Sequence, residues 1–289
     1  MIIVDYSGIA VAAFFANSKG SEAPTEDILR HIVLNSIRMY NMKFREEYGQ
    51  MVIACDGGSW RKDVFPEYKA NRAKARESSG MDWSAFFDTL TKVREEIGAN
   101  LPWIPLHVRG VEADDIIACL VQETQEFGKN EKVMIVSADK DFIQLHKYKN
   151  VKQFSPMKKK LITEKDPVQY IKEHIFRGDS SDGVPNVLSA DSVFIDEGSR
   201  QTPLSKKKIN EWLENYDSLS TIMPEHVYRN FQRNQKVIDL DFIPEDIKSE
   251  ILDIYNNTKP APKMKVLNYL ITNRLSNLVS SASDFFPHE

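Results

Sequence analysis

Residues 133–142 read VMIVSADKDF, and this stretch decides the fold class. Its first half is a continuous apolar run rich in Val and Ile, which is typical of a parallel strand buried on both faces. Its second half carries two carboxylates, Asp139 and Asp141. Ligands of open α/β sheets bind in the crevice beyond the carboxyl ends of the strands. Two acids beside an apolar strand end are costly to bury unless a cation compensates their charge, so the stretch predicts an acidic site at a sheet edge.

Two other stretches repeat this pattern of an apolar run that stops at an aspartate. Residues 1–5 read MIIVD, and residues 51–56 read MVIACD. Parallel strands bring their carboxyl ends to the same edge of a sheet. If the three runs are neighbouring parallel strands, Asp5 and Asp56 therefore lie beside Asp139.

A fourth group of acids begins an expected helix that runs to about Phe127. Glu112, Asp114 and Asp115 fall within a few residues of one another. Acids in a first helical turn are favoured by the helix dipole, so capping is the simple interpretation. Three such acids, in a chain that already directs acids to one crevice, favour metal ligation.

The composition sets the broad class of the protein. The 289 residues are 42% hydrophobic and 28% charged, as is ordinary for a soluble globular chain with a sizeable core. No apolar stretch is long enough to span a bilayer, and Asp5 interrupts the apolar N-terminus, so we expect neither a membrane protein nor a signal peptide. Cys55 and Cys119 form no disulfide or zinc pattern, which makes the cytoplasm the expected compartment.

The charge distribution bears on the class of partner. The formal net charge of -4 argues, taken alone, against nucleic acid. Local patches rather than net charge meet phosphates, however, and residues 60–76 are strongly basic. Their basic side chains are Arg61, Lys62, Lys69, Arg72, Lys74 and Arg76. Of these, Lys69, Arg72 and Arg76 share one face if the stretch is helical.

The ligand types at the candidate site indicate the reaction. All-carboxylate coordination selects Mg²⁺ or Mn²⁺ over zinc. The acids exceed what one Mg²⁺ needs, which favours two ions that clamp the attacking and leaving oxygens of a phosphodiester, while Lys or Arg offsets the developing charge. A serine or cysteine nucleophile with a histidine partner is not visible, which disfavours covalent catalysis. The residues therefore predict metal-dependent hydrolysis of a phosphodiester.

The chain changes character near residue 175. Residues 178–187 read GDSSDGVPNV, which predicts a tight loop between helices and adds Asp179 and Asp182 to the acids. Beyond this loop the pattern predicts further helices and no convincing strand. The expected helices cover residues 205–216, 224–236, 244–257 and 263–279, and residues 188–204 are expected to form a loop.

Six pieces of the chain, in this order, resemble the 5′ nuclease family of flap endonucleases and 5′–3′ exonucleases, and within it the phage ribonuclease H branch. The pieces are residues 2–5, 56–63, 68–76, 112–115, 137–145 and 178–182. The resemblance implies an α/β fold with a mostly parallel central sheet flanked by helices, a PIN-like nuclease core, followed by a smaller all-helical region. The core would be residues 1–175, with a basic arch segment at about 57–82. Residues 176–289 would bind DNA, with a modified helix-three-turn-helix motif at about 171–215.

The resemblance also implies roles for individual residues. The first metal site would be carried by Asp5, Asp56, Glu112, Asp114 and Asp139. The second would use Asp141 and Asp182, with Asp179 nearby, and Asp115 would cap the helix or support the ligands. Lys69 and Arg76 would act on the scissile phosphate together with Asp139 and Asp141. Further nucleic-acid contacts would come from Arg61, Lys62, Arg72 and Lys74.

One part of the chain departs from the family pattern. The family's second Gly-x-Gly hairpin is replaced by residues 188–204, which are followed by a lysine run. We expect Lys206, Lys207 and Lys208 to supply phosphate contacts at a helix N-terminus.

The implied function is that of a structure-specific 5′ nuclease. It would hydrolyse RNA/DNA and DNA/DNA duplexes with free or flapped 5′ ends by a two-metal mechanism, with two Mg²⁺ or with Mn²⁺ in their place. Its implied role is the removal of RNA primers in phage lagging-strand replication. The resemblance also implies that the protein is a monomer in the host cytoplasm and does not bind a membrane. A single-stranded-DNA-binding protein and a sliding clamp are the implied protein partners.

The C-terminal residues and the overall activity each leave alternatives open. Phe285 and Phe286 resemble a clamp-binding peptide, which we favour over docking of the two rings onto the protein's own core. A PIN-like single-strand ribonuclease accounts for the acids, but not for the basic segment or for the long chain beyond Asp182. A catalytically inactive nucleic-acid-binding module finds no support, since the carboxylates are present. An aspartyl phosphatase would need a second acid two residues after Asp5, where Ser7 stands.

Overall fold

The computed structural model describes residues 1–17 and 25–288, except for the side chains of residues 17, 73–75, 77 and 127. The chain divides into two compact units. The first comprises Met1–Gly58, Met81–Thr163 and Glu245–Glu289, and the second comprises Ser59–Gly80 and Glu164–Pro244. The basic segment thus belongs to the second unit, and the last helices return to the first. The predicted domain boundary near residue 175 remains a prediction, because the two compact units are made of discontinuous segments of the chain.

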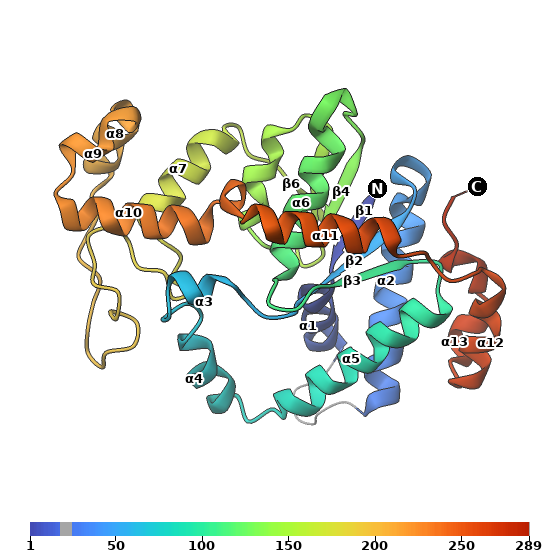
Figure 1. Ribbon diagram of the computed structural model, residues 1–289. Coiled ribbons are helices and arrows are strands. Elements are labelled where there is room, and N and C mark those ends of the chain that lie inside the picture. Colours follow the sequence, from blue (N-terminus) through green and yellow to red (C-terminus); the bar gives the residue numbers. More distant parts are fainter. Residues whose placement is uncertain (18–24, 289) are drawn as a thin grey trace. The chain divides into compact units, whose positions relative to one another are not determined.

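A six-stranded sheet organises the first unit (Figure 1). Its strands are β1 (Ile2–Asp5), β2 (Met51–Cys55), β3 (Ile104–His107), β4 (Val133–Val136), β5 (Val151–Ser155) and β6 (Lys160–Ile162), in the order β3-β2-β1-β4-β5-β6. All pairs are parallel except β5 with β6. The prediction that the three Asp-ended runs are neighbouring parallel strands is therefore confirmed, as is the mostly parallel α/β class. The chain runs outward from β1 to β3 and then restarts at β4, so the strand order reverses between β1 and β4, where such sheets bind ligands.

Helices cover both faces of this sheet. They are α1 (Tyr6–Asn17), α2 (Glu26–Tyr48), α5 (Trp83–Asn100), α6 (Ala113–Gln125) and α11 (Glu245–Asn257), with α12 (Met264–Thr272) and α13 (Ser276–Val279) near the C-terminus. Side chains alternate along a strand, so Ile2 and Val4 share one buried face with residues of α1, α2 and α5. Ile3 points to the other face and is also fully buried, and α6 contacts β1, β2 and β4. The side chains of Thr25 and Asp82 cap α2 and α5 by accepting main-chain N–H groups of the first turn.

Short helices and a long loop build the second unit. Its helices are α3 (Arg61–Val64), α4 (Asn71–Ser78), α7 (Pro167–Arg177), α8 (Lys206–Glu214), α9 (Leu219–Ile222) and α10 (Glu225–Ile238). Phe176 on α7, Trp212 on α8 and Phe231 on α10 pack together at the centre of this unit. Residues 188–204 form a loop, as expected.

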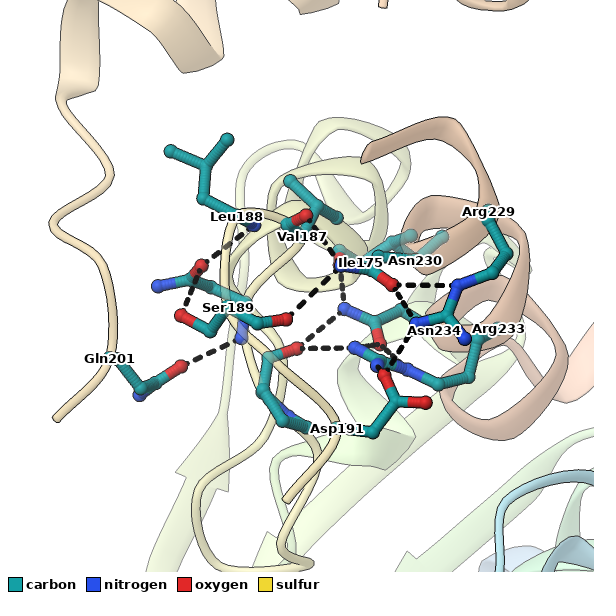
Figure 2. Close-up of polar contacts among 12 residues, drawn as sticks. Ile175, Val187, Leu188, Ser189, Asp191, Gln201, Arg229, Asn230, Arg233 and Asn234 are labelled. Carbon is teal, nitrogen blue, oxygen red and sulfur yellow. Dashed lines mark hydrogen bonds and ion pairs between the residues drawn. The ribbon is translucent and has the colours of Figure 1, made fainter. Parts of the chain in front are cut away.

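Polar side chains of α10 hold the start of this loop in place (Figure 2). Asn230 donates to the carbonyl oxygens of Val187 and Ser189 at 3.0 and 3.1 Å. Asn234, which is fully buried, donates to the carbonyl oxygens of Ile175 and Pro185 at 2.8 and 2.9 Å. Buried carbonyl groups need such partners, because an unpaired one is costly. Residues 185–189 are therefore fixed to the hydrophobic centre by side-chain amides.

An ion pair extends this attachment further into the loop. Asp191 pairs with Arg233 and lies 2.7 Å from Arg229, so both arginines of α10 reach the loop (Figure 2). Gln201, near the far end of the loop, accepts the N–H of Asn186 at 2.7 Å. The start and the far end of the 188–204 segment are therefore both hydrogen-bonded close to residues 185–189 and α10.

The structure corrects one prediction about the basic segment. Lys69 lies outside α4, with a positive φ of 59°, so it does not share a helical face with Arg72 and Arg76. The contacts of its backbone with the loop at Asp182, described below, account for this conformation. Of these three residues, Arg72 and Arg76 lie on α4, four residues apart.

Other elements also differ from the expectations. The helix expected over residues 263–279 is divided into α12 and α13, since Arg274 adopts a φ of 54°. The pattern gave no signal for α1 or for the β5–β6 hairpin. Among the helices of the described residues, none combines the length and apolar character that a bilayer crossing requires.

The C-terminal aromatic pair docks onto the first unit. Phe285 is fully buried and stacks on Trp103, with ring centroids 5.3 Å apart. Asn41 on α2 donates to the carbonyl oxygens of Asp284 and Phe286 at 2.7 and 2.8 Å. Of the two alternatives for this tail, docking onto the protein's own core is the one that the structure shows.

Candidate active site

Three acids stand at the carboxyl ends of the neighbouring strands β2, β1 and β4. Asp5 is the last residue of β1, Asp56 follows β2 directly, and Asp139 comes shortly after Val136, the end of β4. The register pairs Val4 with Val136, so the ends of β1 and β4 are level. The sheet therefore brings acids from distant parts of the sequence to one edge of the first unit.

A chain of hydrogen bonds joins the acids of β1 and β4. The Ser137 hydroxyl donates to Oδ2 of Asp5 at 2.8 Å and accepts the N–H of Asp139 at 3.1 Å. Asp139 in turn accepts the N–H of Asp141 through Oδ1 at 2.9 Å. Oδ1 of Asp5 accepts the N–H of Gly8 at 2.9 Å. An ionised carboxylate has about four acceptor sites, so these hydrogen bonds are compatible with a role as metal ligand.

Gly8 lets the first turn of α1 approach the Asp5 carboxylate. A Cβ atom at this position would overlap the carboxylate oxygens of Asp5. The position therefore needs glycine for its lack of a side chain, and the position of Asp5 depends on it.

The acids near α6 are attached to the end of β2. Oδ1 of Asp56 accepts the N–H of Ala113, the first residue of α6, at 3.0 Å. Glu112 and Asp115 form a capping box in which Asp115 accepts the N–H of Glu112 at 3.1 Å. The capping role predicted for Asp115 is therefore confirmed. Asp114, half-buried, lies in the same helical turn.

Two residues that the sequence reasoning missed support this arrangement. Ser137 is buried and bridges two acids, as described above. Gln153 on β5 is fully buried and donates to the carbonyl oxygens of Ser137, at 3.0 Å, and of Asp139. His146 lies 3.1 Å from the side-chain oxygen of Gln153. The sequence offers one signal for these two residues: Ser137 is a polar residue directly after a buried strand, and Gln153 is a polar residue inside one.

Asp179 belongs to the second unit and lies in the turn that follows α7. It accepts the N–H and the hydroxyl of Ser181 at 2.7 and 2.6 Å, and its carboxylate is 3.6 Å from the His174 ring. Burial raises the pKa of Asp179, but the hydrogen bonds from His174 and Ser181 outweigh it and hold that pKa well below its ordinary value. Asp179 is therefore held in its charged form.

Asp182, in the same loop, contacts the basic segment. Its carboxylate accepts the Tyr68 hydroxyl at 2.8 Å, lies 3.4 Å from Nζ of Lys69 and pairs with Arg72. The predicted metal ligands thus form two groups, six acids in the first unit and Asp179 with Asp182 in the second. Their assignment as ligands stays a prediction.

The predicted phosphate contacts occupy different environments. Arg61 is only 2% exposed and donates to the Val237 carbonyl oxygen at 2.8 Å, a placement typical of a structural residue. Lys62 and Arg76 are exposed. The side chain of Lys74 lies outside the described residues. The lysine run, which comprises Lys206, Lys207 and Lys208, is exposed at the start of α8, and Ser205 caps this helix.

The fold and the acids define an α/β protein whose parallel strand ends gather carboxylates, an arrangement suited to hard divalent cations and phosphoryl chemistry. Residues 1–174 match the family described as 5'-3' exonuclease, N-terminal resolvase-like domain, and residues 158–285 match the family described as T4 RNase H, C terminal. The chain belongs to the 5′–3′ exonuclease family of metal-dependent nucleases, in its ribonuclease H branch.

Individual relatives agree with this assignment. The chain is 36% identical to the ribonuclease H of Enterobacteria phage T4 over 292 residues, which cover 98% of this chain and 95% of the relative. It is 29% identical to a 5'-3' exonuclease of Buchnera aphidicola over 65% of each chain. The T5 D15 protein co-crystallised with metal ions shares the fold, with a TM-score of 0.64 and 19% identity over 88% of this chain and 98% of that one. The family resemblance inferred from the sequence is confirmed.

Proposed function

We propose that the protein is a structure-specific 5′ nuclease that hydrolyses phosphodiesters of RNA/DNA and DNA/DNA duplexes with free or flapped 5′ ends. The observation that carries the proposal is the pair of acids Asp5 and Asp139, which end neighbouring strands and share Ser137. Family membership supplies the direction of attack from the 5′ end. The ribonuclease H of phage T4 and the T5 D15 flap endonuclease, the latter solved as a complex with DNA and metal ions, are the relatives whose names bear on the substrate.

The donor set fits divalent ions that prefer oxygen ligands. Carboxylates of the first unit dominate it, which suits Mg²⁺, or Mn²⁺ in its place. Asp5, Asp56, Glu112, Asp114 and Asp139 would hold one ion, and Asp141, Asp179 and Asp182 would hold a second. Two such ions supply charge that activates water and stabilises the leaving oxygen of a phosphodiester.

The chain's own residues hold these acids in place and balance charge. Ser137 and Gln153 fix the strand end that carries Asp139, so its carboxylate needs little reorganisation when substrate binds. Lys69 and Arg76 would offset negative charge on the scissile phosphate. Lys62, Arg72 and Lys74 would follow the nucleic-acid backbone, as would Lys206, Lys207 and Lys208 at the capped start of α8.

The proposed biological role is the removal of RNA primers during phage lagging-strand replication, by a monomer in the host cytoplasm. A single-stranded-DNA-binding protein is a proposed partner. A sliding clamp that binds Phe285 would have to detach a fully buried ring, so a contact through Phe286 costs less.

The test uses 5′-labelled flapped, nicked and RNA-primed duplexes, incubated with Mg²⁺ or with chelator. We expect short 5′ products that form only when Mg²⁺ is present. The Asp139→Asn variant should lose most of the cleavage rate, and it should unfold at the same temperature as the wild-type protein. Full activity of Asp139→Asn, or cleavage that persists in chelator, would contradict the proposal.

A further inference from the structure

Asp182 is the point at which the basic segment and the acidic loop of the second unit meet. One carboxylate oxygen accepts the Tyr68 hydroxyl and faces Nζ of Lys69, and the other receives the Arg72 guanidinium. The Asp182 side chain is only 10% exposed, whereas that of Arg72 is 42% exposed. Two cations thus share one nearly buried carboxylate.

The backbone shows that this contact belongs to a defined arrangement. The N–H of Lys69 donates to the carbonyl oxygen of Asp182 at 2.7 Å, and the side-chain amide of Asn71 donates to the carbonyl oxygen of Ser180 at 3.0 Å. Lys69 adopts a left-handed backbone conformation, which is strained for a residue with a side chain and persists only where surrounding contacts impose it. The two segments are therefore held together by main chain and side chains alike.

The donors that bind Asp182 are of the kind that also bind phosphate. Lys69 offers an ammonium group and Arg72 a guanidinium group to the Asp182 carboxylate. A phosphate oxygen accepts hydrogen bonds from guanidinium and ammonium groups in the same way as a carboxylate oxygen. A nucleic-acid phosphate therefore competes with Asp182 for the same two side chains.

We propose that Asp182 is an internal substitute for the substrate phosphate, which holds Lys69 and Arg72 until nucleic acid arrives and is then released to bind a divalent ion. This inference rests on the proposed function, which supplies both the phosphate and the ion. Nucleic acid and the divalent ion then bind with positive coupling, and the coupling is reciprocal. Nucleic acid takes Lys69 and Arg72 away from Asp182, which frees Asp182 for the ion. The ion takes Asp182 away from the two cations, which frees them for nucleic acid.

The first experiment measures nucleic-acid affinity without divalent ions. Fluorescence anisotropy would follow a labelled 5′-flap duplex in chelator with the wild type, with Asp182→Asn and with a control, Glu47→Gln. Asn keeps the acceptor for Tyr68 but not the charge. The control makes the same change of charge in the first unit, where it releases Lys132, 3.3 Å from Glu47.

The coupling predicts that Asp182→Asn binds the duplex about three- to tenfold more tightly than the control does, which is the scale of one charge-assisted hydrogen bond. Equal or weaker binding by Asp182→Asn, with unchanged thermal unfolding, would overturn the proposal.

The second experiment measures Mn²⁺ affinity by calorimetry without nucleic acid. Arg72→Ala removes one cation that holds Asp182, so the affinity of the weaker site for Mn²⁺ should rise by about three- to tenfold. The affinity of the same variant for the duplex should fall. The matched control, Lys62→Ala, removes an exposed positive charge from α3 in the same segment. If Arg72 served only as a phosphate contact, the two variants would bind Mn²⁺ equally, and that result would overturn the proposal.

The two experiments separate this inference from the proposed function. A wild-type protein that neither binds nor cuts 5′-ended duplexes would overturn both. Normal metal-dependent cutting, combined with the negative result for either variant, would overturn the coupling alone.

Discussion

Phe285→Ala tests whether the C-terminal residues are part of the core of the first unit. The ring is fully buried, stacks on Trp103 with an interplanar angle of 23°, and lies in the cluster that includes residues of β1, β2 and α2. Removing a buried phenyl ring costs about 3–5 kcal/mol, of which the aromatic pair accounts for about 0.5–1.5 kcal/mol. We expect about 3 kcal/mol, because the chain end can relax into part of the space.

Polar contacts limit how far the variant tail can move. Asn41 and Arg45 donate to main-chain carbonyl oxygens of the tail, and Arg38 pairs with Asp284, so these contacts survive the loss of the ring. The melting temperature should fall by roughly 6–12 °C, measured by circular dichroism. Phe286→Ala is the matched control, since its ring is only partly buried, and it should cost about 1 kcal/mol.

The reasoning would be refuted by a Phe285→Ala variant whose stability lies within about 0.5 kcal/mol of the wild type, the range of ordinary surface substitutions. The nuclease rate per folded molecule should not change, because the tail contributes to stability and not to the acidic site. A clamp that captures Phe285 would have to overcome the same stability contribution.

Three further predictions concern the two units. Gly8→Ala should lower the cleavage rate by roughly tenfold or more with little change in duplex affinity, because the added Cβ displaces the Asp5 carboxylate; an unchanged rate would contradict the role of Gly8. Asn234→Ala should destabilise the protein to urea by about 1–3 kcal/mol, because the buried Ile175 carbonyl loses its side-chain donor; equal unfolding midpoints would contradict this. Asp179, whose pKa is lowered on folding, should contribute stability above its unfolded pKa of about 3.9 that is lost as the pH falls below that value. The stability difference between wild type and Asp179→Asn should therefore shrink on acidification, and a difference that grows would contradict the sign of the shift.

The parts of the fold that the sequence predicts are those set by local patterns. A short apolar run that stops at an acid marks β1, β2 and β4, and the confirmed parallel order places Asp5, Asp56 and Asp139 at one edge. The caps Thr25 and Asp82 are predictable from the sequence because a cap and its helix are adjacent in the chain.

The parts that were missed depend on contacts between distant residues. Ser137 meets Asp5 across 132 positions of sequence, and no local pattern reports such a bond. Lys69 adopts a left-handed conformation in which its N–H donates to the carbonyl oxygen of Asp182, more than a hundred residues away in the sequence. The docking of Phe285 likewise depends on Trp103, which is distant in the sequence. The residues next to Phe285 and Phe286 therefore do not indicate that the first of these rings is buried.

The two acidic groups differ in what holds them, and we expect this difference to set the order in which divalent ions and nucleic acid bind. The acids of the first unit are positioned by hydrogen bonds from Gly8, Ser137 and the start of α6, which donate to carboxylates without neutralising them. These uncharged donors place no opposite charge between the carboxylates and an incoming divalent ion. Asp182, by contrast, pairs with Lys69 and Arg72, so an ion that binds there must displace these two cations. Ion binding in the first unit should therefore need no nucleic acid, whereas ion binding at Asp182 should follow it.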